Sequence, residues 1–201
     1  MRLLLFSDLH CDTNVARDLV QRAKGIDIAI GAGDFANVRR NLSVCLKILR
    51  KLPCPVILVA GNNESTEELE AECAGWSQVH VLHGTGTNLL GQDFFGLGGG
   101  VPITPFGSWS YDFSEEEAGK LLRGCPPGAV LISHSPPKGA VDVSSSGQSL
   151  GSTAVRDTIL RCKPRLVVCG HIHASAGQSK KIGESDVINA GPYGIVYDLK
   201  P

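Results

Sequence analysis

Short apolar runs alternate with helix-like stretches along the first part of the chain. The apolar runs have the length of buried strands and cover residues 2–6, 26–30 and 55–60. The helix-like stretches cover residues 14–24, 38–52 and 66–74. Strands that alternate with helices are typical of a parallel sheet built from strand–helix–strand units. We therefore predict an α/β fold whose first part forms a parallel sheet.

The pattern changes in the middle of the chain. Between Val79 and Leu97, short strand-like segments follow one another across glycine-rich turns, with no interval long enough for a helical crossover. This spacing favours a second, mainly antiparallel sheet. The later helix-like and strand-like segments cover residues 114–123, 129–132, 153–161, 165–169, 185–189 and 193–199. We expect the closing strands to return to the two sheets, and residues 98–109 and 140–151 to be the most mobile loops.

Polar side chains that bind metals follow the apolar runs in five short motifs. These motifs are SDLH at 7–10, GAGDF at 31–35, GNNE at 61–64, SHSPP at 133–137 and CGHIH at 169–173. Ligands in open α/β sheets gather beyond the carboxyl ends of the strands, so donors far apart in sequence can meet there. The candidate donors are Asp8, His10, Asp34, Asn62, His134, His171 and His173. Carboxylate, amide oxygen and neutral imidazole together suit Mn, Fe or Zn.

The order and spelling of these motifs resemble the calcineurin-like metallophosphoesterases, whose pattern is D-x-H, G-D, G-N-H-(D/E), an isolated H and then G-H-x-H. Three further segments, HSPPKG, GSTAVRDTI and VINAGP, resemble the small Icc-related branch of that superfamily. The resemblance covers essentially the whole chain. It implies a single metallophosphoesterase domain over residues 1–201, with two stacked mixed β-sheets flanked by helices in a four-layer α/β/β/α sandwich.

The resemblance also implies a role for each donor. One divalent ion would have the ligands Asp8, His10 and His173, and the other would have Asn62, His134 and His171. Asp34 would bridge the two ions. A shared carboxylate and a shared hydroxide offset the repulsion between two cations about 3.5–4 Å apart. The implied reaction is hydrolysis of a phosphoester by attack of the bridging hydroxide.

One position departs from the family pattern. Asn63 stands where the family has a His that lies near the leaving group or a phosphate oxygen. An amide donates a hydrogen bond but does not titrate near neutral pH, and general acid catalysis contributes about 10²–10⁴-fold. We expect Asn63 and His134 to contact the phosphate oxygens, and esters with poor leaving groups to suffer most. A small phosphodiester or a nucleotide is the predicted substrate, ahead of a monoester.

Two other functions stay open at this point. The fold has members, such as the retromer scaffold subunit, that lost metal ligands and became binding proteins. A chain of that kind should have broken donor motifs, whereas the one substitution here, Asn63, is not needed to hold metal. A protein phosphatase is the other alternative, but it requires an open groove and usually a larger catalytic domain.

Charge and cysteine content restrict the expected class of protein and its cellular compartment. The chain has 19 basic and 20 acidic residues, which argues against the basic surface of a nucleic-acid-binding protein. Its seven cysteines form no C-x-x-C pair, which favours reduced thiols in the cytosol. The first apolar run leads into a donor motif, as a strand does and a signal peptide does not, and no run reaches the roughly 18 residues of a membrane span. We expect a cytoplasmic enzyme without membrane contact or stable nucleic-acid binding, and its oligomeric state stays open.

Overall fold

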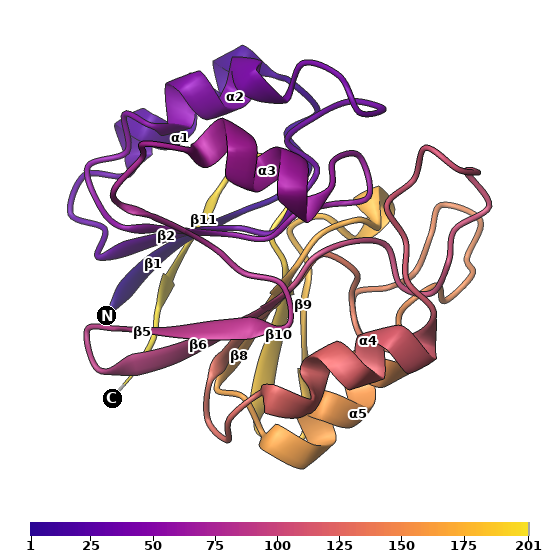
Figure 1. Cartoon of the computed structure of the whole chain (residues 1–201). Coiled ribbons are helices and arrows are strands. Elements are labelled where there is room, and N and C mark those ends of the chain that lie inside the picture. Colours follow the sequence, from indigo (N-terminus) through magenta and orange to yellow (C-terminus); the bar gives the residue numbers. More distant parts are fainter. Residues whose placement is uncertain (201) are drawn as a thin grey trace.

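The computed structural model describes residues 1–200 as two β-sheets stacked between two groups of helices (Figure 1). The first sheet has the strand order β11-β1-β2-β3-β4. Its strands are β1 (Arg2–Phe6), β2 (Ile28–Gly31), β3 (Val56–Leu58), β4 (Val79–Val81) and β11 (Ile195–Asp198). The first four run parallel, and β11 pairs antiparallel with β1. This sheet is the predicted product of the strand–helix–strand pattern.

Three helices cover the outer face of the first sheet. They are α1 (Thr13–Arg22), α2 (Leu42–Leu49) and α3 (Thr66–Cys73). Helix α2 is shorter than the predicted helix 38–52, because Val38, Arg39 and Asn41 have φ angles of 49°, 61° and 62°. These left-handed conformations cannot continue a right-handed helix. Residues 37–41 instead form a turn closed by the bridge between Asn37 and Arg40.

The second sheet has the strand order β5-β6-β7-β8-β10-β9. Its strands are β5 (Thr85–Leu89), β6 (Gln92–Leu97), β7 (Val130–Ser133), β8 (Leu166–Cys169), β9 (Ser179–Ile182) and β10 (Ser185–Asn189). The helices that pack on its outer face are α4 (Glu115–Leu121) and α5 (Thr153–Cys162). Two short 3-10 helices complete the fold, η1 (Leu122–Gly124) and η2 (His173–Ser175).

The expectation that the second sheet is mainly antiparallel is wrong. Strands β6, β7, β8 and β10 form a parallel centre, and only the edge pairs β5–β6 and β9–β10 are antiparallel. Helices α4 and α5 supply the long crossovers that parallel strands need. Residues 79–97 are also divided between the sheets, because β4 pairs with β3. The fold of two stacked mixed sheets flanked by helices is confirmed.

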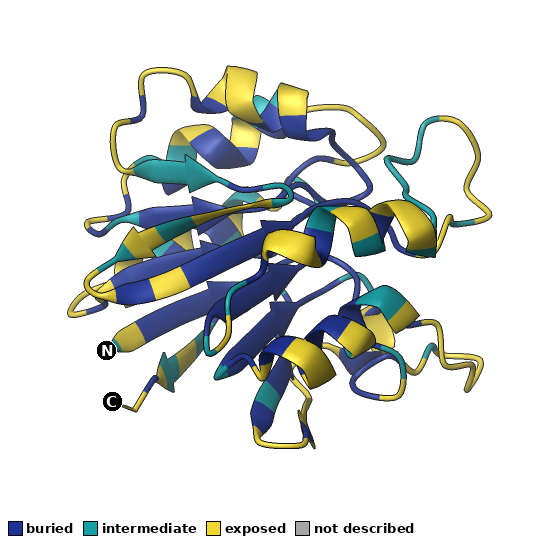
Figure 2. Ribbon diagram, turned by 60° about the horizontal axis from the view of Figure 1, so that its bottom comes forward, coloured by how far each residue is buried: buried dark blue, intermediate teal, exposed yellow. Residues whose placement is uncertain are grey.

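Alternating apolar side chains fix how the layers stack. Leu3 and Leu5 of β1 belong to the cluster between the two sheets, whereas Leu4 and Phe6 belong to the cluster under α1, α2 and α3. All four are fully buried, and the central strands are dark blue along most of their length in Figure 2. A shift of one residue in the pairing of β1 would move each of its side chains to the opposite face of the sheet. This register therefore determines where the loops beyond the strands lie. In the described part of the chain, no helix is long and apolar enough to cross a membrane.

Candidate metal centre

All seven predicted donors lie beyond the carboxyl ends of strands, six on the connecting loops and His173 at the start of η2. The donors follow β1 (Asp8, His10), β2 (Asp34), β3 (Asn62), β7 (His134) and β8 (His171, His173). These strands come from both sheets, so the site lies where the carboxyl ends of the two sheets meet. Stacking of the sheets brings together residues that are up to 165 positions apart in the sequence (173 minus 8).

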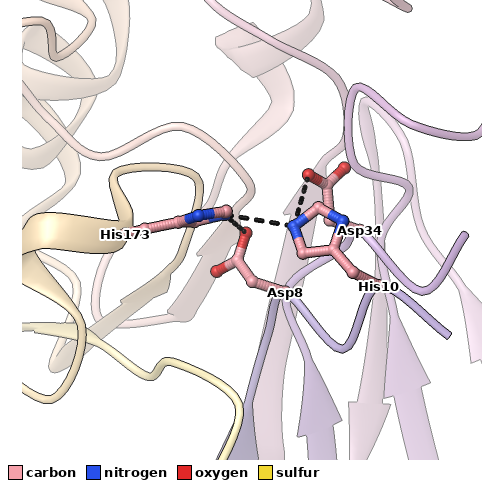
Figure 3. Close-up of side chains that lie close together, drawn as sticks. All are labelled: Asp8, His10, Asp34 and His173. Atoms are coloured by element: carbon pink, nitrogen blue, oxygen red, sulfur yellow. Dashed lines mark hydrogen bonds and ion pairs between the residues drawn. The ribbon is translucent and has the colours of Figure 1, made fainter. Parts of the chain in front are cut away.

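One group of donors comprises Asp8, His10, Asp34 and His173 (Figure 3). A ligand atom from each of the four lies within 4.8 Å of the others, so the group could hold a metal ion. His173 Nε2 lies 3.6 Å from Asp8 Oδ1, and His10 Nε2 lies 3.6 Å from Asp34 Oδ2. The two imidazole Nε2 atoms are 3.1 Å apart. Ring nitrogens and carboxylate oxygens therefore converge on one point.

A second group adjoins the first on the other side of Asp34. His134 Nε2 lies 3.4 Å from Asp34 Oδ1 and 3.3 Å from Asn62 Oδ1. The ring of His171 packs against that of His134, with the centroids 4.9 Å apart. One oxygen of Asp34 thus faces His134 while the other faces His10. This is the position that a carboxylate shared between two ions requires.

The hydrogen bonds of His134 test whether these residues suit a cation. His134 Nδ1 lies 2.7 Å from the carbonyl oxygen of Ala32, which can only accept, so Nδ1 carries a hydrogen. In the neutral ring, the Nε2 lone pair then faces two acceptors, Asn62 Oδ1 and Asp34 Oδ1. A cation among these three atoms would bind all of them, so the donor set fits a metal ion.

The charges around the site point the same way. Burial opposes the charged form of His134, but Asp34 and Asp8 raise its pKa above the ordinary value, because the two carboxylates favour positive charge beside them. Burial, together with the neighbouring His134, lowers the pKa of His171 to about 3. His171 is therefore neutral at physiological pH, and neutral imidazole is the form that binds metals.

Asp8 is held as an anion. Burial opposes its ionisation, but the nearby imidazole of His173 and the charge of His134 lower its pKa to about 2. Ser7 Oγ donates to Asp8 Oδ2 over 2.6 Å, and the backbone N–H of His171 lies 3.0 and 3.1 Å from the two carboxylate oxygens. These donors fix the carboxylate and connect the loop after β1 to the loop after β8.

Two glycines of the motifs allow these close approaches. A Cβ atom at Gly61 would lie 2.0 Å from Asp34 Oδ1, and one at Gly170 would lie 2.4 Å from Asp8 Oδ2. Both distances are far below van der Waals contact. Asp8 and Asp34 themselves adopt left-handed backbone conformations, with φ angles of 56° and 58°. Such strain persists where the surrounding structure enforces it, and here it aims both carboxylates into the site.

Two residues that support the site lie outside the predicted donor set. Glu64 is fully buried and accepts hydrogen bonds from the N–H groups of Asp34, Ala36 and Gly61 over 2.7 to 2.9 Å. Burial and the charge of Asp34 raise its pKa to about 7. Asn189 is also fully buried, and its amide donates to the carbonyl oxygens of Gly170 and Ile172. Their positions in GNNE and VINAGP are the only signals of these roles in the sequence.

Asn63 faces the predicted bridging carboxylate. It is 6% exposed. Its Nδ2 donates to Asp34 Oδ2 over 2.7 Å, and its backbone N–H donates to Asp34 Oδ1 over 2.9 Å. Its Oδ1 accepts from the N–H of Val38. The structure thus gives Asn63 a contact with Asp34, and its predicted contact with substrate stays a prediction.

The family now follows from sequence, fold and site together. The chain belongs to the calcineurin-like phosphoesterases, because the model of that family matches residues 1–175. This family consists of phosphoesterases that use divalent metals. No curated protein matches the chain.

Several solved structures share the fold. TT1561 of Thermus thermophilus is 18% identical over 99% of each chain, with a TM-score of 0.77. A dimetal phosphatase from Danio rerio is 14% identical over 94% of this chain and 86% of its own, with a TM-score of 0.64. The phosphopantetheinyl hydrolase of Mycobacterium tuberculosis is 15% identical over 99% of this chain and 96% of its own, also with a TM-score of 0.64. At these identities the likeness concerns the fold.

Proposed function

We propose that the chain is a dinuclear-metal-dependent phosphoesterase that hydrolyses a small phosphodiester or a nucleotide. The observation that carries the proposal is the position of Asp34 between two groups of donors, with Oδ2 directed at His10 and Oδ1 at His134. If each group holds one ion, a carboxylate in that position can bind both ions. Without ions, the convergence of so many acceptors and imidazoles in a largely buried place would be costly.

The proposed ligand sets are those that the family resemblance implies. One ion would be held by Asp8, His10, His173 and Asp34, and the other by Asn62, His134, His171 and Asp34. These oxygen and nitrogen donors suit Mn, Fe or Zn. When bound, two such ions would act as Lewis acids on the phosphate and supply an activated water at neutral pH.

The residues of the chain would contribute orientation and charge. The bond between His134 Nδ1 and Ala32 fixes the His134 ring, so that Nε2 points into the site. Asn63 holds the carboxylate of Asp34 through both its amide and its backbone N–H. We propose that Asn63 acts mainly as a positioning residue and supplies no proton to the leaving group. Substrates whose leaving group departs without a proton should then react fastest.

The alternative of a non-catalytic scaffold is less well supported. A scaffold has no need of a complete donor set, yet all seven candidate donors are present, and His134, Asn62 and His171 lie next to the group that contains Asp34. Nor does any contact of the described residues favour a protein phosphatase over an enzyme for small phosphoesters.

A metal-supplemented substrate screen tests the proposal. Purified protein should be incubated with Mn, Fe or Zn and assayed on bis(p-nitrophenyl) phosphate, p-nitrophenyl phosphate and a panel of nucleotides. We expect a metal-dependent hydrolysis that is faster for the activated diester than for alkyl monoesters. Asp34→Asn should abolish it, while the matched variant Asp157→Asn, at an exposed position of α5, should retain it. Absence of hydrolysis with every metal and substrate would contradict the proposal.

The role of Asn63 needs a separate test. A series of substituted phenyl phosphodiesters should be assayed with wild-type protein and with Asn63→His, and the metal content of both should be measured. If the missing imidazole is an absent general acid, Asn63→His flattens the dependence of rate on leaving-group pKa. Equal slopes at equal metal content would show that position 63 does not serve as the acid, and a loss of metal would show that the hydrogen bond to Asp34 is its main contribution.

A further inference from the structure

A partly exposed aromatic pair lies on the loop between β6 and α4. We refer to residues 102–110 as the aromatic loop. Within it, the rings of Phe106 and Trp109 are stacked, with centroids 5.8 Å apart and planes inclined by 18°. Phe106 is 52% exposed, and Ile103 in the same loop is 65% exposed. Trp109 is half-buried, so the two rings pack on each other while part of the pair, mainly Phe106, stays open to solvent.

The aromatic loop is attached directly to the candidate metal centre. Asn62, one of the predicted ligands, donates from Nδ2 to Ser110 Oγ over 3.1 Å, and its carbonyl oxygen accepts from the N–H of Tyr111 over 3.0 Å. Trp109 directly precedes Ser110, so the aromatic pair begins one residue from this contact. Arg39, whose backbone N–H donates to the carbonyl oxygen of Asn63, also reaches the carbonyl oxygen of Trp109. These contacts place the backbone of the aromatic loop next to Asn62, so the loop that carries the pair borders the candidate metal centre.

Hydrogen bonds fix the base of the aromatic loop. Asp112 accepts from the N–H and the hydroxyl of Thr104 over 2.9 and 2.6 Å, and from the hydroxyl of Ser110 over 2.9 Å. The N–H of Val101 donates to the buried hydroxyl of Ser135 over 2.8 Å. The bonds to Asp112 tie together Thr104 and Ser110, which flank the aromatic pair, and the bond to Ser135 anchors the start of the loop. A surface that is fixed before a ligand arrives loses less entropy on binding.

We propose that Phe106 and Trp109 form a specificity-determining platform for an aromatic ring of the substrate, with a nucleobase as the chemical class that fits. Every nucleobase has a flat face, so any of them can stack on an aromatic side chain. The phosphate of the same molecule would lie at the metal centre, next to Asn62. The platform rests on the proposed function, because that function supplies the phosphate anchor. It narrows the substrate from small phosphoesters in general to those that carry a planar ring, such as nucleotides.

A binding comparison isolates the contribution of the ring. AMP carries adenine where ribose 5-phosphate carries a hydroxyl group, so the dissociation constants of the two compounds on the metal-loaded protein should be measured by calorimetry. Stacking of a base on an aromatic side chain favours binding, and a tenfold change in affinity corresponds to about 1.4 kcal/mol. We expect AMP to bind about tenfold more tightly than ribose 5-phosphate.

Variants of the platform should remove this difference selectively. The pair of substitutions Phe106→Leu and Trp109→Leu keeps apolar side chains but removes the rings, and should bring AMP to the affinity of ribose 5-phosphate. The conservative substitution Trp109→Phe should keep most of the preference. Leu160→Ala is the matched control, because Leu160 is similarly exposed at 54% but lies on α5. This control should leave both affinities unchanged.

Quenching of Trp109 fluorescence by AMP, but not by ribose 5-phosphate, gives a readout that needs no variant. The other tryptophan, Trp76, is only 8% exposed and packs on Arg50, so it should not respond. Equal affinities for the two compounds in the wild-type protein, without quenching, would overturn the platform. If the same preparation still hydrolyses bis(p-nitrophenyl) phosphate, the proposed function survives that result. A ring-dependent preference for AMP without any hydrolysis would instead overturn the proposed function alone.

Discussion

Gly61 is the position where a single added methyl group should damage the site most. A Cβ atom there would lie 2.0 Å from Asp34 Oδ1 and 2.2 Å from the backbone nitrogen of Asp34, whereas ordinary contacts begin at about 3.4 Å. The neighbouring atoms are a backbone nitrogen and a buried carboxylate, so neither can move aside like the end of a flexible chain. Gly61→Ala must therefore displace Asp34 or the loop that carries it.

The expected cost follows from the hydrogen bonds that Asp34 would lose. Its carboxylate accepts from the backbone N–H and the amide of Asn63 over 2.9 and 2.7 Å. Hydrogen bonds to charged groups contribute about 1.5–3 kcal/mol each, so loss of both lowers the free energy of unfolding by roughly 3–6 kcal/mol. Proteins of this kind are stable by only about 5–15 kcal/mol. The variant should therefore be strongly destabilised, and it should also lose metal.

Urea unfolding and elemental analysis would measure both effects. Gly119→Ala is the matched control, because a Cβ atom at Gly119 in α4 meets nothing within 4 Å. Alanine is favoured over glycine inside a helix by roughly 0.5–1 kcal/mol, so the control should be slightly stabilised and should keep its metal. If Gly61→Ala unfolds within about 1 kcal/mol of the wild type and retains its metal, the argument from the geometry of Gly61 is refuted.

Other buried or hydrogen-bonded groups give three more predictions. Glu64→Gln leaves one of three buried N–H groups without an acceptor. Urea unfolding should therefore show a free energy of unfolding lower by roughly 1–3 kcal/mol, and an unchanged value would contradict the role of Glu64. Burial opposes ionisation of Asp142, but hydrogen bonds from Ser149 and two backbone N–H groups lower its pKa below 3.8. Because the folded pKa is the lower one, ionised Asp142 stabilises the protein near neutral pH and loses this effect as the pH falls through the folded pKa. The free energies of unfolding of wild type and Asp142→Asn should therefore differ near pH 7 and become equal in acid. A difference that stays constant with pH would contradict this prediction. Burial raises the pKa of Cys45 to about 12, so its thiol should react with a disulfide reagent only after unfolding, whereas half-buried Cys11 should react slowly in the native protein. Rapid reaction of every thiol in the native protein would contradict that assignment.

The sequence predicts the strands better than it predicts their pairing. Residues 2–6 and 185–189 are strands with the predicted bounds, because apolar composition is a local signal. The helices α4 and α5 are predicted, but the direction of pairing depends on which neighbour each strand joins after them, and a local pattern does not reveal that choice. Strand β9 escapes prediction because SKKI is polar and lies at an edge, with three of its four residues exposed. The predicted helix 38–52 begins too early because its left-handed first residues carry no glycine as a signal.

For the candidate site, the sequence predicts the donors but not the residues that hold them. The donors stand in motifs directly after strands, so their types and order identify them. The supporting contacts of Asn189 and Ser110 join segments 19 and 48 residues apart, and neither residue type is unusual where it stands. The aromatic pair is similar: Phe106 and Trp109 are ordinary loop residues in the sequence, and only the structure shows that their rings stack on a loop whose Ser110 contacts Asn62.

Anomalous diffraction from crystals grown with Mn would test the central claim most directly. The account predicts two anomalous peaks at full occupancy, one among Asp8, His10 and His173 and the other among Asn62, His134 and His171. Both peaks should lie within bonding distance of Asp34, one on each carboxylate oxygen. A single peak, or peaks away from Asp34, would contradict a dinuclear centre built on that shared carboxylate.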